Sequence, residues 1–326
     1  MNSPKVSVIM PVYNGERFIV SAIESVLAQT YKNFEIVIVN DGSTDNSREK
    51  LSRYLQMPFV QYIEQINRGV AAARNTAIRK ATGEWIALLD QDDLWLPRKL
   101  EAQVDFMRAH PAVPMIHANV NWIDALGQRV ELDWNNNVSG NCLAQLFQRN
   151  RIAVVTVVVK KECLGEVGLF DESLSGVDDY DLWLRIARRY PIGRLDETVA
   201  CYRFHELNTS RAGGMMAHRE LAAIEQFVKV FPDVTQTIGR RAVNSRKAEL
   251  HFKLGGWHMW HTHDFAAAKR EFLHAIKLRP SHLPSYRLFL WCALTSEQRK
   301  GLQWYWCRLR GAGVSKPQPP NAHSAS

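Results

Sequence analysis

The stretch Leu88-Leu89-Asp90-Gln91-Asp92-Asp93-Leu94-Trp95 decides the fold, because an apolar run ends there at three carboxylates in four positions. The run Trp85–Leu89 predicts a buried strand, and in an open α/β sheet the C-terminal end of a strand faces the crevice where ligands bind. Asp90 and Asp92 lie two residues apart, so in an extended segment their side chains point the same way. Two carboxylates on one side suit Mg²⁺ or Mn²⁺. An acidic turn that caps a helix opened by Pro97 is the alternative.

The composition predicts a globular protein in a reducing compartment. The 326 residues suffice for a catalytic domain with an appendage. The five cysteines are scattered, with no Cys-x-x-Cys pair, which argues against disulfides and against a structural zinc site. No apolar run approaches the roughly 18 residues of a spanning helix, and Val6–Met10 is too short for a signal sequence. We therefore expect a cytoplasmic protein.

Charge is unevenly distributed along the chain. From Arg211 onward there are 18 Lys and Arg against 7 Asp and Glu, whereas residues 1–210 carry 23 against 26. A slightly acidic front part and a basic back part indicate two regions with different partners. Nucleic acid and an anionic membrane surface are the usual targets of such a basic region.

Apolar runs alternate with helical stretches in the front part. The runs that predict buried strands are Val6–Met10, which Pro11 ends, Glu35–Val39, Phe59–Ile63 and Trp85–Leu89. Helical periodicity marks the intervening stretches Glu16–Gln29, Thr44–Leu55 and Gly69–Ala81. Continuous apolar strands joined by helices predict an α/β fold with a largely parallel sheet covered by helices. A nucleotide should bind at the C-terminal ends of these strands.

The pattern continues less regularly to residue 210. We expect helices at Leu100–Ala109 and Asp178–Arg189 and strands at Met115–Ile123, Ala153–Val159 and Thr198–His205. A boundary near Arg211–Gly214 divides residues 1–210 from an all-helical region, 215–310, and from a Pro/Ser/Ala tail, 311–326, whose composition predicts disorder. Within the helical region, Phe265–Pro280 resembles the second helix of a tetratricopeptide unit, and Leu250–Trp260 would supply the first.

A set of short motifs occurs in the order that a known family shows. They are Pro11-Val12-Tyr13-Asn14, Glu35–Asp45, Asn67-Arg68-Gly69, Ala73-Arg74-Asn75, Asp90-Gln91-Asp92, Asp178–Trp183 and Tyr202-Arg203-Phe204-His205. By these motifs, residues 1–210 resemble the inverting glycosyltransferases of family two. The resemblance implies the GT-A fold, a Rossmann-like, mostly parallel sheet flanked by helices.

The resemblance implies a site for a nucleotide-sugar donor. Its expected donor-binding residues are Pro11, Tyr13, Asn14, Asp41, Asn67, Arg74, Asp90, Arg203 and His205. The first three would line the base and ribose, Asp41 would accept the N–H of a uracil-type base, and the last two would lie near the diphosphate. An Asx turn at Asp41, a surface arginine at Arg74 and a structural histidine at His205 are the alternatives.

The resemblance also implies a metal and a catalytic base. Asp92, with Asp90, would ligate Mg²⁺ or Mn²⁺ at the diphosphate, where negative charge develops as the nucleoside diphosphate departs. Asp179 matches the acid that takes the proton of the acceptor hydroxyl. It is preceded by Asp178 where the family has Glu, and adjacent carboxylates raise one another's pKa, which suits a base. Helix capping by Asp178, Asp179 and Asp181 is the alternative.

We therefore expect a metal-dependent inverting glycosyltransferase that moves a sugar from a UDP-sugar to a hydroxyl of a glycan or lipid-linked acceptor in cell-surface polysaccharide biosynthesis. The aromatic and basic segment Arg299–Arg310 would hold it peripherally on an anionic membrane, unless that segment packs internally. No nucleic acid is expected.

Two other functions remain as alternatives. A sugar nucleotidyltransferase would need a Gly-rich loop and a Lys directly after the first strand, and Pro11–Gly15 supplies neither. The other is a noncatalytic nucleotide-sugar-binding or scaffold protein that acts through its helical region. The histidines of His258–His263 lack a fourth ligand at zinc spacing, so amphipathic packing explains them better than a metal site.

Overall fold

The structure, a computed structural model, describes residues 3–132, 134–206, 208, 214–295 and 297–299. The chain divides into two compact units, Met1–Val243 and Asn244–Ser326. The division therefore lies further along the chain than the boundary that the sequence predicts after residue 210. The first unit includes helix α8 (Gly214–Val230), whose Ala223 packs with Leu174 and Val177 in a small core cluster.

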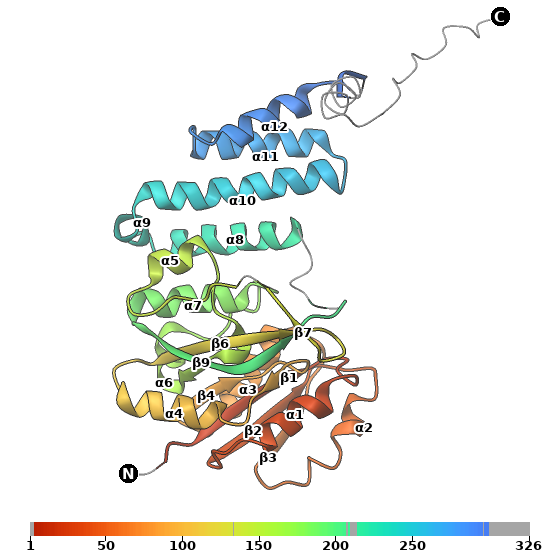
Figure 1. Ribbon diagram of the computed structural model, residues 1–326, viewed down its shortest axis with the longest axis vertical. Helices are drawn as coiled ribbons and strands as arrows, with labels where there is room; N and C mark the ends of the chain where they lie inside the picture. Colours follow the sequence, from red (N-terminus) through yellow and green to blue (C-terminus); the bar gives the residue numbers. More distant parts are fainter. Residues whose placement is uncertain (1–2, 133, 207, 209–213, 296, 300–326) are drawn as a thin grey trace, which may run out of the picture. The chain divides into compact units, whose positions relative to one another are not determined.

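One mixed sheet of nine strands forms the centre of the first unit, in the part of the chain that the structure describes (Figure 1). Eight strands follow the order β3-β2-β1-β4-β8-β6-β9-β5, and β7 pairs with β6. Their bounds are β1 Val6–Val12, β2 Phe34–Asn40, β3 Val60–Glu64, β4 Trp85–Leu88, β5 Leu94–Trp95, β6 Met115–Ile123, β7 Arg129–Val130, β8 Val158–Lys160 and β9 Ile192–Arg203.

The predicted parallel arrangement holds for the first half of the sheet. Strands β1 to β4 pair in parallel, as their alternation with helices implies. Beyond β4 the sheet is mixed, because β8 runs antiparallel to both β4 and β6, and β5 runs antiparallel to β9. Only β6 and β9 restore a parallel pair there. The sheet thus consists of a parallel half, β1 to β4, joined to a half with mixed strand directions.

Helices pack against the sheet, and their apolar residues form the hydrophobic core together with those of the strands. Helices α1 (Ile19–Leu27) and α4 (Lys99–Ala109) contribute Ile23 and Leu100 to the same cluster as Val8 of β1. Helix α3 (Val70–Lys80) packs against β1 and β2. The remaining helices of this unit are α2 Ser47–Leu51, α5 Leu143–Gln148, α6 Lys161–Val167, α7 Asp178–Arg189 and α9 Val234–Thr237. The predicted bounds of α7 are confirmed.

Other predicted boundaries are wrong: β9 begins at Ile192 instead of Thr198, α2 begins at Ser47 instead of Thr44, and three more differ for a clear physical reason. Strand β1 continues through Pro11, since β4 stops pairing at Ile9 and the missing proline N–H removes no ladder bond there. Within Ala153–Val159 a short 3-10 helix occupies Val154–Thr156, so β8 begins only afterwards. Pro97 lies two positions ahead of α4 rather than in its first turn, because Arg98 is the N-cap residue.

The second unit is helical, as the sequence predicts. It holds most of α10 (Arg240–Trp260), with α11 (Phe265–Leu278) and α12 (Leu283–Ala293). Asp264 caps α11, where its side chain accepts a hydrogen bond of 2.8 Å from the Ala267 N–H. No described helix combines the length and the apolarity that crossing a lipid bilayer requires. The predicted tail 311–326 and all but the first residue of Arg299–Arg310 lie outside the described residues.

Candidate active site

A buried arginine joins the end of β4 to the start of α7. Arg74, on α3, donates to both carboxylate oxygens of Asp90 at 2.7 and 2.9 Å and to Asp178 at 2.8 Å. The side chain of Arg74 is only 6% exposed and that of Asp178 only 3%. The alternative of a surface arginine is therefore wrong. The two carboxylates make the burial of Arg74 possible, because a buried cation is tolerated only when it is paired. Asp178 does not cap α7: its N-cap residue is Val177, without a side-chain capping bond.

Asp179 lies beside this network with a strongly perturbed pKa. Burial and the neighbouring Asp178 raise the pKa of Asp179 to about 7, although Arg74 opposes the rise. Its Oδ1 accepts from the Tyr180 N–H at 2.7 Å and its Oδ2 from the Asn150 amide at 3.2 Å. A carboxylate that titrates near neutral pH is suited to general-base chemistry. Burial also raises the pKa of Asp90, against the influence of Arg74.

A second cluster forms where the end of β9 meets the loop after β4. The His205 Nε2 lies 2.7 Å from the Asp92 Oδ2. The Arg203 side chain donates to the Asp92 carbonyl at 2.8 Å, and its backbone N–H donates to the Asp93 carboxylate at 2.8 Å. Strand β5 pairs with β9 at Leu94 and Cys201, directly beside these contacts, and this pairing sets their register.

An aromatic ring supports this second cluster. The guanidinium of Arg203 lies 4.8 Å from the ring centroid of Phe18, and the His205 ring lies 5.1 Å from the same ring. The structure thus brings Asp92, Arg203 and His205 together, as the motifs predict. The histidine is part of a polar cluster and is not an isolated residue at a strand end.

The loops after β1 and β2 are tied to each other and to the acidic stretch. The backbone of Tyr13 exchanges two hydrogen bonds with the Gln91 side chain, at 2.8 and 2.9 Å. Asn14 adopts a positive φ of 49°, which Asn tolerates better than most residues, and its side chain accepts from the Thr44 N–H at 2.8 Å. Tyr13 itself is 47% exposed, so its ring is accessible to a ligand.

Asp41 is buried and shapes the turn between β3 and α3. Its carboxylate accepts from the Gln65 amide at 2.7 Å, from the Arg68 N–H at 2.9 Å and from the Gly69 N–H at 2.8 Å. The sequence offered an Asx turn at Asp41 as an alternative. In the loop after β2 it is Asn40 that makes the Asx-type hydrogen bond, since its side-chain oxygen accepts from the Ser43 N–H at 3.0 Å. Asn67 is exposed on the same turn. Asp41 therefore has a structural role whether or not it contacts a ligand.

Six of the predicted residues form three groups at the carboxyl ends of the strands. Arg74 and Asp90 belong to one, Asp92, Arg203 and His205 to another, and Asp41 to the β3–α3 turn. Pro11 is the next-to-last residue of β1. Sequence reasoning missed the partners of these residues, which are Phe18, Gln91, Asn150 and Asp178.

Known proteins resemble this chain in sequence and in fold. Residues 7–158 match the family model described as Glycosyl transferase family 2. The relative WfgD of Escherichia coli, a UDP-Glc:alpha-D-GlcNAc-diphosphoundecaprenol beta-1,3-glucosyltransferase, is 32% identical over 211 residues, which make up 63% of this chain and 78% of WfgD. The chain belongs to glycosyl transferase family 2.

Some relatives in the family are much longer. An uncharacterized glycosyltransferase of Rickettsia felis is 39% identical over 200 residues, which make up 61% of this chain but 33% of that protein. The chain therefore matches about a third of the length of this relative, and the same holds for those of Rickettsia conorii and Rickettsia bellii.

Solved structures confirm the predicted GT-A fold. The structure of TarS 1–349 from S. aureus aligns with a TM-score of 0.65 at 17% identity and covers 93% of this chain and 91% of that one. The mannosyltransferase PcManGT from Pyrobaculum calidifontis, in complex with GDP-Man and Mn²⁺, aligns with a TM-score of 0.61 at 21% identity, covering 96% and 85%.

The donor atoms at the second cluster fit a divalent cation. A carboxylate and an imidazole whose Oδ2 and Nε2 lie 2.7 Å apart are ligands that Mn²⁺ accepts. Asp92 and His205 are therefore the residues suited to hold such an ion directly. Asp90 fits less directly, because both of its oxygens accept hydrogen bonds from Arg74.

Proposed function

We propose that this family 2 member is an inverting glycosyltransferase that transfers a sugar from a UDP-sugar to a hydroxyl of a glycan or lipid-linked acceptor. The observation that carries the proposal is Asp179, a half-buried carboxylate whose pKa of about 7 arises beside the Arg74–Asp90–Asp178 network. An ordinary helix-capping aspartate would have its pKa lowered by hydrogen bonds to the helix N–H groups. A raised pKa instead supports the role of a proton acceptor.

In the proposed reaction, Asp179 takes the proton of the acceptor hydroxyl. The hydroxyl oxygen forms a bond to the anomeric carbon as the bond from that carbon to the nucleoside diphosphate breaks, which inverts the configuration. A divalent cation, Mg²⁺ or Mn²⁺, would stabilise the charge that develops on the leaving diphosphate. Asp92 and His205 would hold it, and Asp90, fixed by Arg74, would lie by the ribose and the ion.

A uridine nucleotide is the donor that the residues and comparisons favour. A carboxylate offers about four acceptor positions, and three donors of the chain occupy three of those of Asp41, so one acceptor position is left for the N–H of a uracil ring. The name of WfgD gives UDP-Glc as its donor, and TarS 1–349 has structures with UDP and UDP-GlcNAc. The exposed Tyr13, with Pro11, Asn14 and Asn67, would complete the base and ribose site.

The name of WfgD and the charge of the segment Arg299–Arg310 support the proposed acceptor and location. WfgD acts, by its name, on a sugar attached to diphosphoundecaprenol, which is a membrane lipid. We propose a comparable lipid-linked or glycan acceptor in cell-surface polysaccharide biosynthesis. The chain would work in the cytoplasm, peripherally on the inner face of the plasma membrane, where the aromatic and basic segment Arg299–Arg310 would meet anionic lipid.

A donor screen tests the proposal. Purified protein is incubated with UDP-, GDP- and dTDP-sugars and lipid-diphosphate acceptors, and the release of nucleoside diphosphate is measured. We expect release of UDP only when an acceptor is present, and a product of inverted anomeric configuration. Production of pyrophosphate from a nucleoside triphosphate and a sugar phosphate would indicate a nucleotidyltransferase instead. Binding of UDP without turnover on any acceptor would favour the scaffold function.

A further inference from the structure

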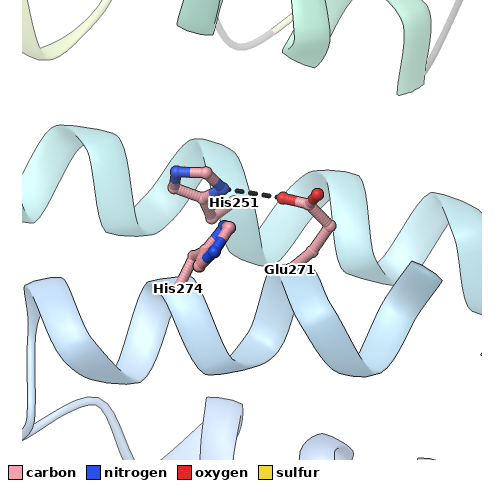
Figure 2. A group of neighbouring side chains, drawn as sticks. All are labelled: His251, Glu271 and His274. Carbon is pink, nitrogen blue, oxygen red and sulfur yellow. Dashed lines mark hydrogen bonds and ion pairs between the residues drawn. The ribbon is translucent and has the colours of Figure 1, made fainter. Parts of the chain in front are cut away.

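Three potential metal ligands meet between α10 and α11 in the second unit. His251 lies on α10, and Glu271 and His274 lie three positions apart on α11, so the latter two share one helix face. Each offers one ligand atom, and these atoms all lie within 4.8 Å of one another. Figure 2 shows the three side chains directed toward the space between the two helices. None of them belongs to the candidate active site.

The internal distances are close to those that one metal ion requires. The His251 Nδ1 lies 2.7 Å from the Glu271 Oε2, and the two imidazole rings lie 5.0 Å apart, nearly perpendicular. Ligands at about 2.0–2.1 Å from a tetrahedral Zn²⁺ lie roughly 3.4 Å from each other. Small side-chain rotations therefore suffice to convert the present arrangement into a coordination shell.

Helices α10 and α11 pack closely against each other next to the three ligand residues. A Cβ on Gly255, one turn after His251, would lie 2.7 Å from the ring of Phe272, the residue that follows Glu271. Only glycine permits this close approach of α10 to α11. The rings of Phe252 and Phe272 lie 5.7 Å apart and add to the contact. This packing holds the ligands in position before any ion binds, which reduces the entropic cost of binding.

The cluster supplies suitable charge and access. Burial opposes ionisation of Glu271, but its hydrogen bond with His251 and the nearby His274 and His258 lower its pKa, so it is a carboxylate at neutral pH. His251 and Glu271 are partly buried, whereas His274 is exposed. Solvent therefore reaches one side of the cluster, where a water molecule can take a fourth position.

We propose that His251, Glu271 and His274 bind one Zn²⁺ ion, or a related first-row transition metal, which fastens α10 to α11. Two imidazoles and one carboxylate form a donor set that zinc sites with an open fourth position use. Imidazole ligands favour Zn²⁺, Co²⁺, Ni²⁺ or Cu²⁺ over Mg²⁺ and Ca²⁺. The site thus differs in its metal preference from the active site, and it does not depend on the proposed function. The ordinary alternative is a His251–Glu271 hydrogen bond that bridges the helices without a metal.

Binding of Zn²⁺ to the full-length protein tests this proposal. Protein stripped of metal is titrated with ZnCl₂ in a calorimeter, and its Tm is measured with and without ZnCl₂. Co²⁺ then serves as a spectroscopic probe, since its visible absorption reports imidazole coordination. The variants are His274→Ala, which changes an exposed residue, and Glu271→Gln, which keeps a hydrogen-bonding group beside His251. His218→Ala, an exposed histidine on α8, is the matched control.

We expect the parent and His218→Ala to bind Zn²⁺ at micromolar concentration with a rise in Tm, one equivalent at this cluster and any further equivalent at Asp92 and His205. His274→Ala and Glu271→Gln should bind Zn²⁺ at this cluster at least about 100-fold more weakly, since losing a ligand costs more than losing an outer contact, which costs about 10–100-fold. Their Tm should then respond less to ZnCl₂ than that of the parent. If the parent binds no Zn²⁺, or if both variants bind it as the parent does, the cluster is only a helix-bridging hydrogen bond.

Discussion

Substituting Asp179 by Asn should stabilise the folded protein at alkaline pH. In the fold the pKa of Asp179 is raised to about 7 by burial and by Asp178, whereas an unfolded aspartate titrates near 3.9. Between these values the folded state binds the proton and the unfolded state does not, so the free energy of unfolding falls as pH rises. The Asn side chain stays neutral and escapes this loss.

The magnitude follows from the size of the pKa difference. Each pKa unit corresponds to about 1.36 kcal/mol, so the loss at pH 8 has an upper limit of about 4 kcal/mol. At pH 5 the free energy of unfolding has decreased by only about 1.5 kcal/mol for the same reason. The stability of Asp179→Asn relative to the parent should therefore increase by up to about 2.5 kcal/mol between pH 5 and pH 8. The Tyr180 N–H bond survives, because the Asn oxygen accepts it equally well.

Urea unfolding at pH 5 and pH 8 measures this increase directly. Asp105→Asn is the control, since it removes the same charge from an exposed position on α4, where we expect the difference from the parent to be nearly constant with pH. A difference for Asp179→Asn that stays constant, or that shrinks toward pH 8, would refute the reasoning. Asp179 would then not hold a proton near neutral pH and would be an ordinary helix-start residue.

Three further predictions concern the ion pair, the active-site metal and the membrane. Arg74→Ala should lower the free energy of unfolding at pH 7 by about 3–5 kcal/mol, since it leaves Asp90 and Asp178 unpaired; a loss below about 1 kcal/mol in urea would contradict this. Asp92→Ala or EDTA should abolish sugar transfer while the circular dichroism spectrum is unchanged, and full turnover in EDTA would exclude a metal. Removing residues 300–326 should weaken sedimentation with anionic vesicles at low salt, at about 1 kcal/mol per lost surface cation. Equal sedimentation of the truncated and full chains would argue against that role.

Much of the fold could be predicted because the front strands are continuous apolar runs. Strands such as Glu35–Val39 are buried on both faces, so their residues are almost all apolar, and this pattern can be recognised in the sequence alone. The two-residue strands β5 and β7 could not be predicted, since two residues carry no periodicity. The direction of β8 was equally hidden, because it depends on pairing with β4 and β6, which are distant in sequence.

The sequence indicates which residues belong to the candidate site, but it does not indicate which of them contact one another. Carboxylates directly after a strand mark the ligand edge of a sheet, which is why Asp90 and Asp92 stand out. The partner of Arg74, Asp178, is 104 positions away, and no local pattern connects the two. Gln91 lies between two acids, and no local pattern shows that its side chain binds the backbone of Tyr13. Tertiary hydrogen bonds of this kind follow from the fold as a whole.

The rate of sugar transfer by Asp179→Asn tests the central claim most directly. It should be measured together with the affinity for UDP, using Asp181→Asn as the control, since that residue lies on the same helix and pairs with Arg185. We predict a rate lower by about 10²–10⁴-fold for Asp179→Asn, the usual contribution of a general base, with UDP affinity unchanged. Asp181→Asn should have a much smaller effect. Transfer by Asp179→Asn at close to the parental rate, or a loss of UDP binding in step with activity, would contradict the account.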